Sequence, residues 1–250
     1  MQTVHSSDGT AIAFQSVGSG TPVVLVGGAF NDRNSTAGLG ALLAEAGLTA
    51  VSYDRRGRGG SGDTEPYAVD REIEDLAAVL TAVGSTAVYG MSSGGILAML
   101  AAHHGLPITQ AAVYEPPFND DPSEAFAEAQ ASRAASGRRG EAVEAFLTTT
   151  GMPPQMIDSM RQGPAWPYLV GLAHTLSYDA RIVARGSIQA LAELPTPTLV
   201  VHGDASPPFL RDAAASLAAT LPNPTSVSLP DQTHNVDITV LAPELAKFFG

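Results

Sequence analysis

The feature that most constrains this chain is a glycine-flanked serine between an apolar strand and an apolar helix. Residues 86–89 are a short β-branched and aromatic run typical of a buried strand, and the apolar residues 96–100 fall at helical spacing. Between them lies Gly90-x-Ser92-x-Gly94, the pattern of a nucleophile elbow. An ordinary strand-to-helix turn fits the glycines alone. The flanking strand and helix favour Ser92 as a nucleophile, with helix N–H groups available to a nearby anion.

Composition restricts the class of protein. The 250 residues, 44% hydrophobic and 15% charged, predict one α/β domain with an insertion, or at most two domains. A net charge of −12 disfavours nucleic-acid and anionic-membrane partners and leaves a small-molecule substrate. The absence of cysteine excludes disulfides and thiolate chemistry. With no signal-peptide pattern and no long apolar run, we expect a soluble cytoplasmic protein; the sequence leaves homo-oligomerisation open.

Strands and helices alternate through most of the chain. The continuous apolar run 23–26 is typical of a strand buried on both faces, and Asp8-Gly9 marks a hairpin turn. Such alternation predicts βαβ units and a mostly parallel sheet with functional groups at the carboxyl ends of its strands. The expected strands are 3–5, 11–14, 23–26, 50–53, 86–89, 111–114, 198–202 and 225–229, and the expected helices include 36–46, 70–83, 208–221 and 240–249.

The alternation breaks between residues 118 and 194, where the pattern is helical throughout and no strand is expected. We predict that this stretch is a helical cap inserted into a core domain made of residues 1–117 and 195–250. Its Trp166, Tyr168 and His174 are candidate substrate-binding residues, although each also fits a structural role.

Together the motifs make the chain resemble an α/β-hydrolase over essentially its whole length. That resemblance implies an α/β fold, a Ser-acid-His triad in that chain order, an oxyanion hole of backbone amides and a substrate pocket beneath the cap. The motifs, in order, are the glycine turn at 27–28, the loop Asp54-Arg55-Arg56-Gly57-x-Gly59, the elbow at 90–95, the helical insertion, the strand end His202-Gly203-Asp204 and a late histidine.

The resemblance supplies a base but leaves the acid open. His234 directly follows the last expected strand, where the family places its histidine, and a serine hydroxyl needs such a proton acceptor. Relatives commonly carry the acid at the position held here by Ser206, which cannot stabilise an imidazolium. Glu115, at the end of the strand after the elbow, is our first candidate for the acid. Asp204 is the alternative, although the family more often uses that aspartate structurally.

The resemblance also implies which residues donate to the oxyanion and how the arginines of the loop 54–59, here called the arginine loop, are paired. Ser93, which follows the nucleophile, and Ala29, which follows the glycine pair, are the expected backbone donors. Gly27 replaces the family's usual histidine, a change that leaves a backbone donor intact. We expect Arg55 and Arg56 to form ion pairs within their own neighbourhood.

These features predict a serine hydrolase that acts on an ester, lactone or thioester of a small, fairly apolar compound. The missing acid at Ser206 keeps a second hypothesis open, in which His234 is an acid/base for cyclisation, elimination or carbon–carbon cleavage. A non-catalytic small-molecule binder is the third. The sequence shows no metal grouping, no Walker sequence and no dinucleotide fingerprint, so we expect no metal or other cofactor.

Overall fold

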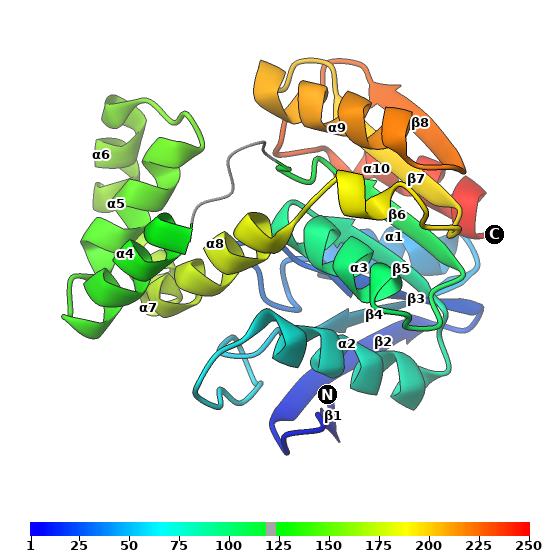
Figure 1. The fold of residues 1–250 in the computed structure, drawn as a ribbon, viewed down its shortest axis with the longest axis horizontal. Coiled ribbons are helices and arrows are strands. Elements are labelled where there is room, and N and C mark those ends of the chain that lie inside the picture. The colour runs from blue at the N-terminus through cyan, green and yellow to red at the C-terminus, as the bar shows by residue number, and fades with distance from the viewer. Residues whose placement is uncertain (119–123) are drawn as a thin grey trace.

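A computed structural model describes residues 1–118 and 124–250, and within them an eight-stranded sheet forms the centre of the molecule (Figure 1). The strand order is β1-β2-β4-β3-β5-β6-β7-β8. Pairing is antiparallel for β1–β2 and β2–β4, and parallel from β4 to β8. The strands are β1 Gln2–His5, β2 Ala11–Gly18, β3 Thr21–Val26, β4 Leu48–Tyr53, β5 Ala87–Met91, β6 Gln110–Tyr114, β7 Thr198–Gly203 and β8 Pro224–Leu229.

Helices cover both faces of the sheet (Figure 1). On one face α1 (Ala37–Glu45) and α10 (Ile238–Phe249) share an apolar cluster with the side chains of β3 and β7. On the other face lie α2 (Val69–Val83), α3 (Ser93–His103) and α9 (Pro208–Thr220). The central strands are buried on both sides, which is why their sequences are continuous apolar runs rather than alternating ones.

Between β6 and β7 the described residues form helices and connecting turns. Figure 1 shows α4–α7 grouped at one end of the sheet, with α8 leading back toward α3. We call residues 124–194 the helical segment; residues 119–123 of the predicted insertion lie outside the described residues. Its elements are α4 Glu124–Ala135, α5 Arg139–Thr149, α6 Pro154–Gln162, α7 Trp166–Gly171, η1 Ala173–Thr175, α8 Leu176–Arg185 and η2 Gln189–Leu191.

The helical segment has a small core of its own. Val143, Leu147, Ile157 and Leu176 are buried together, and Trp166 packs against them. Burial of this apolar surface stabilises the arrangement of α5–α8, and Phe30 of the loop after β3 packs against the same cluster.

The predicted fold class is confirmed, and the expected strands and helices occur within a few residues of their predicted ends. The largest shift is in β2, which continues to Gly18 instead of ending at residue 14. The strand before Ser92 runs through Gly90 to Met91 and pairs with β6 along that length. No helix in residues 1–118 and 124–250 is long and apolar enough to cross a membrane.

Candidate active site

Ser92 stands at the junction of β5 and α3 in a strained backbone conformation. Its φ of 54° and ψ of −128° are values that residues with a side chain rarely adopt. The turn is closed by contacts that exclude a side chain on either flanking glycine. A Cβ on Gly90 would lie 2.4 Å from the Gly94 carbonyl oxygen, and one on Gly94 would lie 2.4 Å from the Val26 carbonyl oxygen. The glycines of the motif are therefore required for this geometry.

The imidazole of His234 meets a carboxylate, and that carboxylate belongs to Glu115. His234 Nδ1 lies 2.8 Å from Glu115 Oε2, within hydrogen-bonding distance. The second carboxylate oxygen accepts the backbone N–H of Gly203 at 2.8 Å. Three strand ends thus converge, because Glu115 follows β6, Gly203 ends β7 and His234 follows β8.

Glu115 is held as an anion although it is completely buried. Burial by itself raises the pKa of the carboxyl group, but the hydrogen bonds from His234 and from the Gly203 N–H favour the charged form, and the net pKa lies below its ordinary value. An ionised carboxylate at Nδ1 fixes the ring so that Nε2 is free to accept a proton. The backbone of Glu115, like that of Ser92, has a positive φ, here 45°.

The loop that carries His234 is fixed by two further contacts. The Tyr114 hydroxyl donates to the Thr233 carbonyl oxygen at 2.6 Å. Asp204 Oδ1 accepts the Asp231 N–H at 2.7 Å, and Asp204 is otherwise exposed. Asp204, the alternative acid, thus holds the loop, while Glu115 makes the contact to the imidazole.

Two backbone N–H groups flank Ser92, and neither donates to another described residue. The Ser93 N–H belongs to the first residue of α3, where helix geometry leaves it without an internal partner. The Ala29 N–H follows the glycine turn, which approaches Ser92 so closely that a Cβ on Gly28 would lie 3.0 Å from the Ser92 Cβ. Ala29 and Ser93, the two predicted oxyanion donors, therefore lie close to Ser92 and line the same cavity.

A cavity of about 1300 Å³ opens onto these groups, and Ser92, His234, Ala29 and Ser93 all line it. Its walls come from the carboxyl ends of the strands, from α5 and α8 of the helical segment, and from α9. The described lining includes Asp179, Asp212 and His234 but neither lysine nor arginine. Apolar side chains predominate, among them Phe30, Phe118, Phe146, Met152, Ile188 and Phe209.

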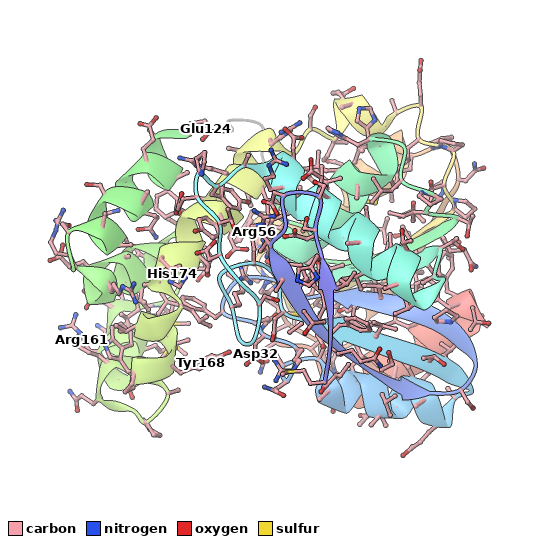
Figure 2. The ribbon with its side chains drawn as sticks, turned by 90° about the horizontal axis from the view of Figure 1, so that it is seen from below. Asp32, Arg56, Glu124, Arg161, Tyr168 and His174 are labelled. Atoms are coloured by element: carbon pink, nitrogen blue, oxygen red, sulfur yellow. The ribbon has the colours of Figure 1, made fainter. Side chains whose placement is uncertain are left out.

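The three substrate-binding candidates of the helical segment do not belong to the described lining of this cavity. Trp166 packs in the segment's own core, and the Tyr168 hydroxyl donates to the Phe30 carbonyl oxygen at 3.3 Å. His174 Nε2 lies 3.0 Å from the carbonyl oxygen of Gly57. Figure 2 shows Tyr168 and His174 on the side of the segment that faces the core. The contacts of Tyr168 and His174 join the segment to the core, whereas Trp166 packs within the segment.

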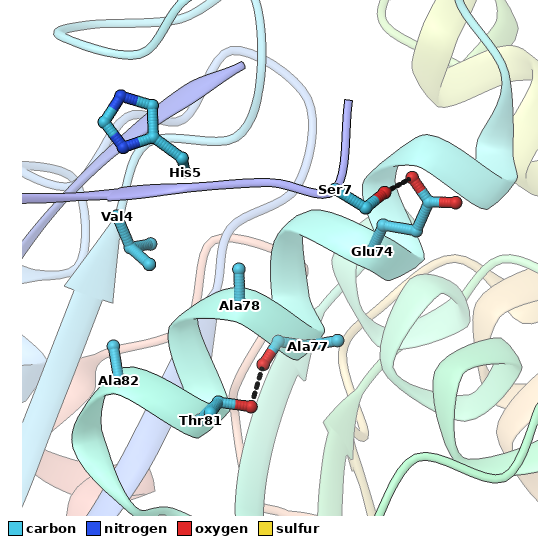
Figure 3. Close-up of a pocket in the computed structure, with 8 residues that line it drawn as sticks. All are labelled: Val4, His5, Ser7, Glu74, Ala77, Ala78, Thr81 and Ala82. Atoms are coloured by element: carbon cyan, nitrogen blue, oxygen red, sulfur yellow. Dashed lines mark hydrogen bonds between the residues drawn. The ribbon is translucent and has the colours of Figure 1, made fainter. Parts of the chain in front are cut away.

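A second hollow lies between β1 and α2 (Figure 3). It is lined by His5, Ser7, Glu74 and small side chains of α2; Figure 3 shows the Ser7 hydroxyl bonded to Glu74 and the Thr81 hydroxyl bonded to the Ala77 carbonyl oxygen. None of the predicted site residues reaches it. Within the described chain no group of three or more His, Asp or Glu side chains is arranged to hold a metal ion.

The arginine loop after β4 does more than the sequence predicts. Arg56 pairs with Asp75 of the adjacent α2, as expected for a local contact. Arg55 pairs with Glu72 of α2 in the same way, but its Nη1 also lies 2.7 Å from Asp179 of α8, a contact that the expectation of local pairing does not include. No periodicity distinguishes Asp179 from the other acidic residues of the helical segment, so its link to the core emerges only from the structure.

Comparison with known proteins identifies the family. The model of the alpha/beta hydrolase family matches residues 23–245. An alpha/beta hydrolase from Sphaerobacter thermophilus is 48% identical, with all of both chains covered and a TM-score of 0.92. An esterase from Exiguobacterium antarcticum is 17% identical, with 99% of this chain and 98% of that chain covered and a TM-score of 0.80.

A curated relative from Gibberella zeae, an AB hydrolase superfamily protein, is 35% identical over 89 residues. That match covers 34% of this chain and 32% of the relative, so the chain spans about a third of that relative's length. The family model covers most of the chain, and the protein belongs to the alpha/beta hydrolase family. It is an alpha/beta hydrolase enzyme, as the family and its hydrolase neighbours indicate.

Proposed function

We propose that the protein is a serine hydrolase that cleaves an ester, lactone or thioester of a small, uncharged and largely apolar compound. The observation that carries this proposal is the 2.8 Å contact between His234 Nδ1 and the buried Glu115 carboxylate. It supplies the acid that the sequence lacks at Ser206, and it does so at the cavity that Ser92 lines. Esterases among the structural neighbours are consistent with this chemistry.

In the proposed mechanism the Ser92 hydroxyl attacks the substrate carbonyl while His234 Nε2 accepts its proton. Glu115 holds the ring in the required tautomer and stabilises the imidazolium that forms. The N–H groups of Ala29 and Ser93 bind the oxyanion of the tetrahedral intermediate. His234 then returns the proton to the leaving alcohol or thiol, and a water molecule releases the acyl group from Ser92 by the same steps.

The cavity argues for the substrate class. Its volume of about 1300 Å³ exceeds what acetate esters fill, and its walls are mostly apolar. With no lysine or arginine in the described lining, and with the exposed Asp212 in it, the cavity offers no cation to a second carboxylate on the acyl chain. A neutral chain of several carbons fits the lining, because each buried methylene contributes roughly 0.8 kcal/mol.

Hydrolysis of p-nitrophenyl esters from acetate to decanoate tests the proposal. We expect kcat/KM to rise from acetate to chains of intermediate length, and Ser92→Ala to lower it by about 10³-fold or more. A monoester of a dicarboxylic acid of equal length should react at least about tenfold more slowly than its neutral counterpart.

Ser159→Ala, on the exposed side of α6, is the matched control and should retain wild-type kinetics. If Ser92→Ala kept most of the activity while His234→Ala lost it, the serine-nucleophile mechanism would be wrong, and acid/base chemistry by His234 alone would replace it.

A further inference from the structure

The buried carboxylate of Asp179 joins α8 to both backbone donors beside Ser92. We propose that Asp179 is a positioning residue, which fixes the Ser93 N–H through the Ser93 hydroxyl and the Ala29 N–H through Arg58. On this proposal the docking of the helical segment sets the geometry of the oxyanion hole. The inference rests on the proposed function, since only a reaction with an oxyanion needs these two donors aligned.

The first connection is direct. The Ser93 hydroxyl donates to Asp179 Oδ1 at 2.7 Å, and both residues are buried. Ser93 begins α3, so its own N–H is one of the donors that the helix leaves free. Anchoring this side chain restrains the rotation of the peptide that carries the N–H.

The second connection runs through Arg58. Its Nη2 lies 2.7 Å from Asp179 Oδ2, and its Nη1 donates to the Gly28 carbonyl oxygen at 2.5 Å. In a trans peptide the C=O and the following N–H point in opposite directions. Holding the Gly28 carbonyl toward Arg58 therefore turns the Ala29 N–H to the opposite side, which is the side of the cavity that Ala29 lines.

Arg55 reinforces the same loop. Its Nη1 donates to Asp179 Oδ1 at 2.7 Å and to the Gly27 carbonyl oxygen at 3.2 Å. The other edge of its guanidinium makes two 2.7 Å bonds to Glu72 of α2. Both carbonyls of the glycine turn are thus held by arginines that share one carboxylate.

Asp179 acts through these partners rather than on substrate. Its side chain is only 1% exposed, and both carboxylate oxygens are bonded to protein donors. Burial by itself raises the pKa of Asp179, but the charges of Arg58 and Arg55 and the Ser93 hydrogen bond favour the anion, and the net pKa is lowered. An ionised Asp179 keeps both arginines in place.

Asp179→Asn is the test, with Asp75→Asn as its matched control. Asp75 is equally buried and makes two 2.7 Å bonds to Arg56, but it does not belong to the described lining of the cavity. We expect Asp179→Asn to lower kcat on a p-nitrophenyl ester by about 10–100-fold, with KM changed by less than about threefold. A trifluoromethyl ketone, which mimics the tetrahedral intermediate, should bind more weakly by the same factor.

Asp75→Asn should lose about as much thermal stability as Asp179→Asn, but its kcat should stay within about threefold of wild type. If the two variants had equal kcat at equal stability, or if Asp179→Asn raised KM alone, the proposal would be overturned. If Asp179→Asn fails to fold, Arg58→Lys is the second test variant, because lysine keeps the charge but lacks the guanidinium group that bonds both Asp179 and the Gly28 carbonyl. Wild-type kcat and inhibitor affinity in Arg58→Lys would equally contradict the proposal.

The outcome separates the two proposals. An inactive Ser92→Ala together with a fully active Asp179→Asn rejects the positioning role alone. A fully active Ser92→Ala rejects the proposed function, and the positioning role with it.

Discussion

At the scale of single residues, the candidate site depends on which residue supplies the carboxylate that contacts His234. Glu115 follows β6, one strand nearer to the serine than the position held by Ser206, yet it reaches His234 Nδ1. The Gly203 N–H donates to the other carboxylate oxygen of Glu115, so both oxygens have a hydrogen-bond partner in the buried site. Ser206 is itself buried and brings no charge to compete with Glu115.

Glu115→Gln should therefore lower kcat by about 10²–10⁴-fold, because an amide that donates to Nδ1 favours the wrong imidazole tautomer and cannot stabilise the imidazolium. Steady-state kinetics on a p-nitrophenyl ester measure the effect. Asp204→Asn, which keeps an acceptor for the Asp231 N–H, should stay within about threefold of wild type. The reverse ranking of the two variants would make Asp204 the acid.

Much of this residue-scale picture can be predicted from the sequence, for a physical reason. Ser92 directly follows a strand and His234 lies in the loop after the last one, so local pattern alone predicts which edge of the sheet they occupy. The choice between Glu115 and Asp204 depends on side-chain reach across two strands, which no local pattern encodes. Trp166 was equally ambiguous, because an aromatic residue on a helix fits a core and a binding wall alike.

At the scale of elements, α8 connects the helical segment to the core. Asp179, buried against Arg55 and Arg58, is bonded to both, while Tyr178 stacks on Tyr67 with ring centroids 3.8 Å apart. A helix docked by buried ion pairs depends on those charges, because removing one partner leaves the others buried and unpaired.

This docking should make stability depend on pH. The folded-state pKa of Asp179 lies below its ordinary value of 3.8, so its contribution is present above that value and is lost as pH falls through the lower, folded pKa. Chemical denaturation of Asp179→Asn between about pH 6 and pH 2 should show a smaller acid-induced loss of unfolding free energy than wild type. The exposed Asp158→Asn, which changes the charge equally, should follow the wild-type curve. Identical slopes for Asp179→Asn and wild type would contradict this account of α8.

At the scale of the whole molecule, the sheet collects groups from across the chain at one edge. The loop that carries Ala29 follows β3, Ser92 follows β5, Glu115 follows β6 and His234 follows β8. The helical segment adds walls to the cavity that these groups border. The alternation of strands and helices predicts this edge but not the shape of the cavity. That shape depends on how α5, α8 and α9 pack, and residues of all three line it.

The central claim is that Ser92 is an activated nucleophile, and covalent labelling tests it most directly. Treatment with a fluorophosphonate, followed by intact-protein and peptide mass spectrometry, should show one phosphonyl group per chain on Ser92. The label should be absent in Ser92→Ala and strongly slowed in His234→Ala. A folded wild-type protein that takes up no label, or takes it up at Ser93 instead, would contradict the account.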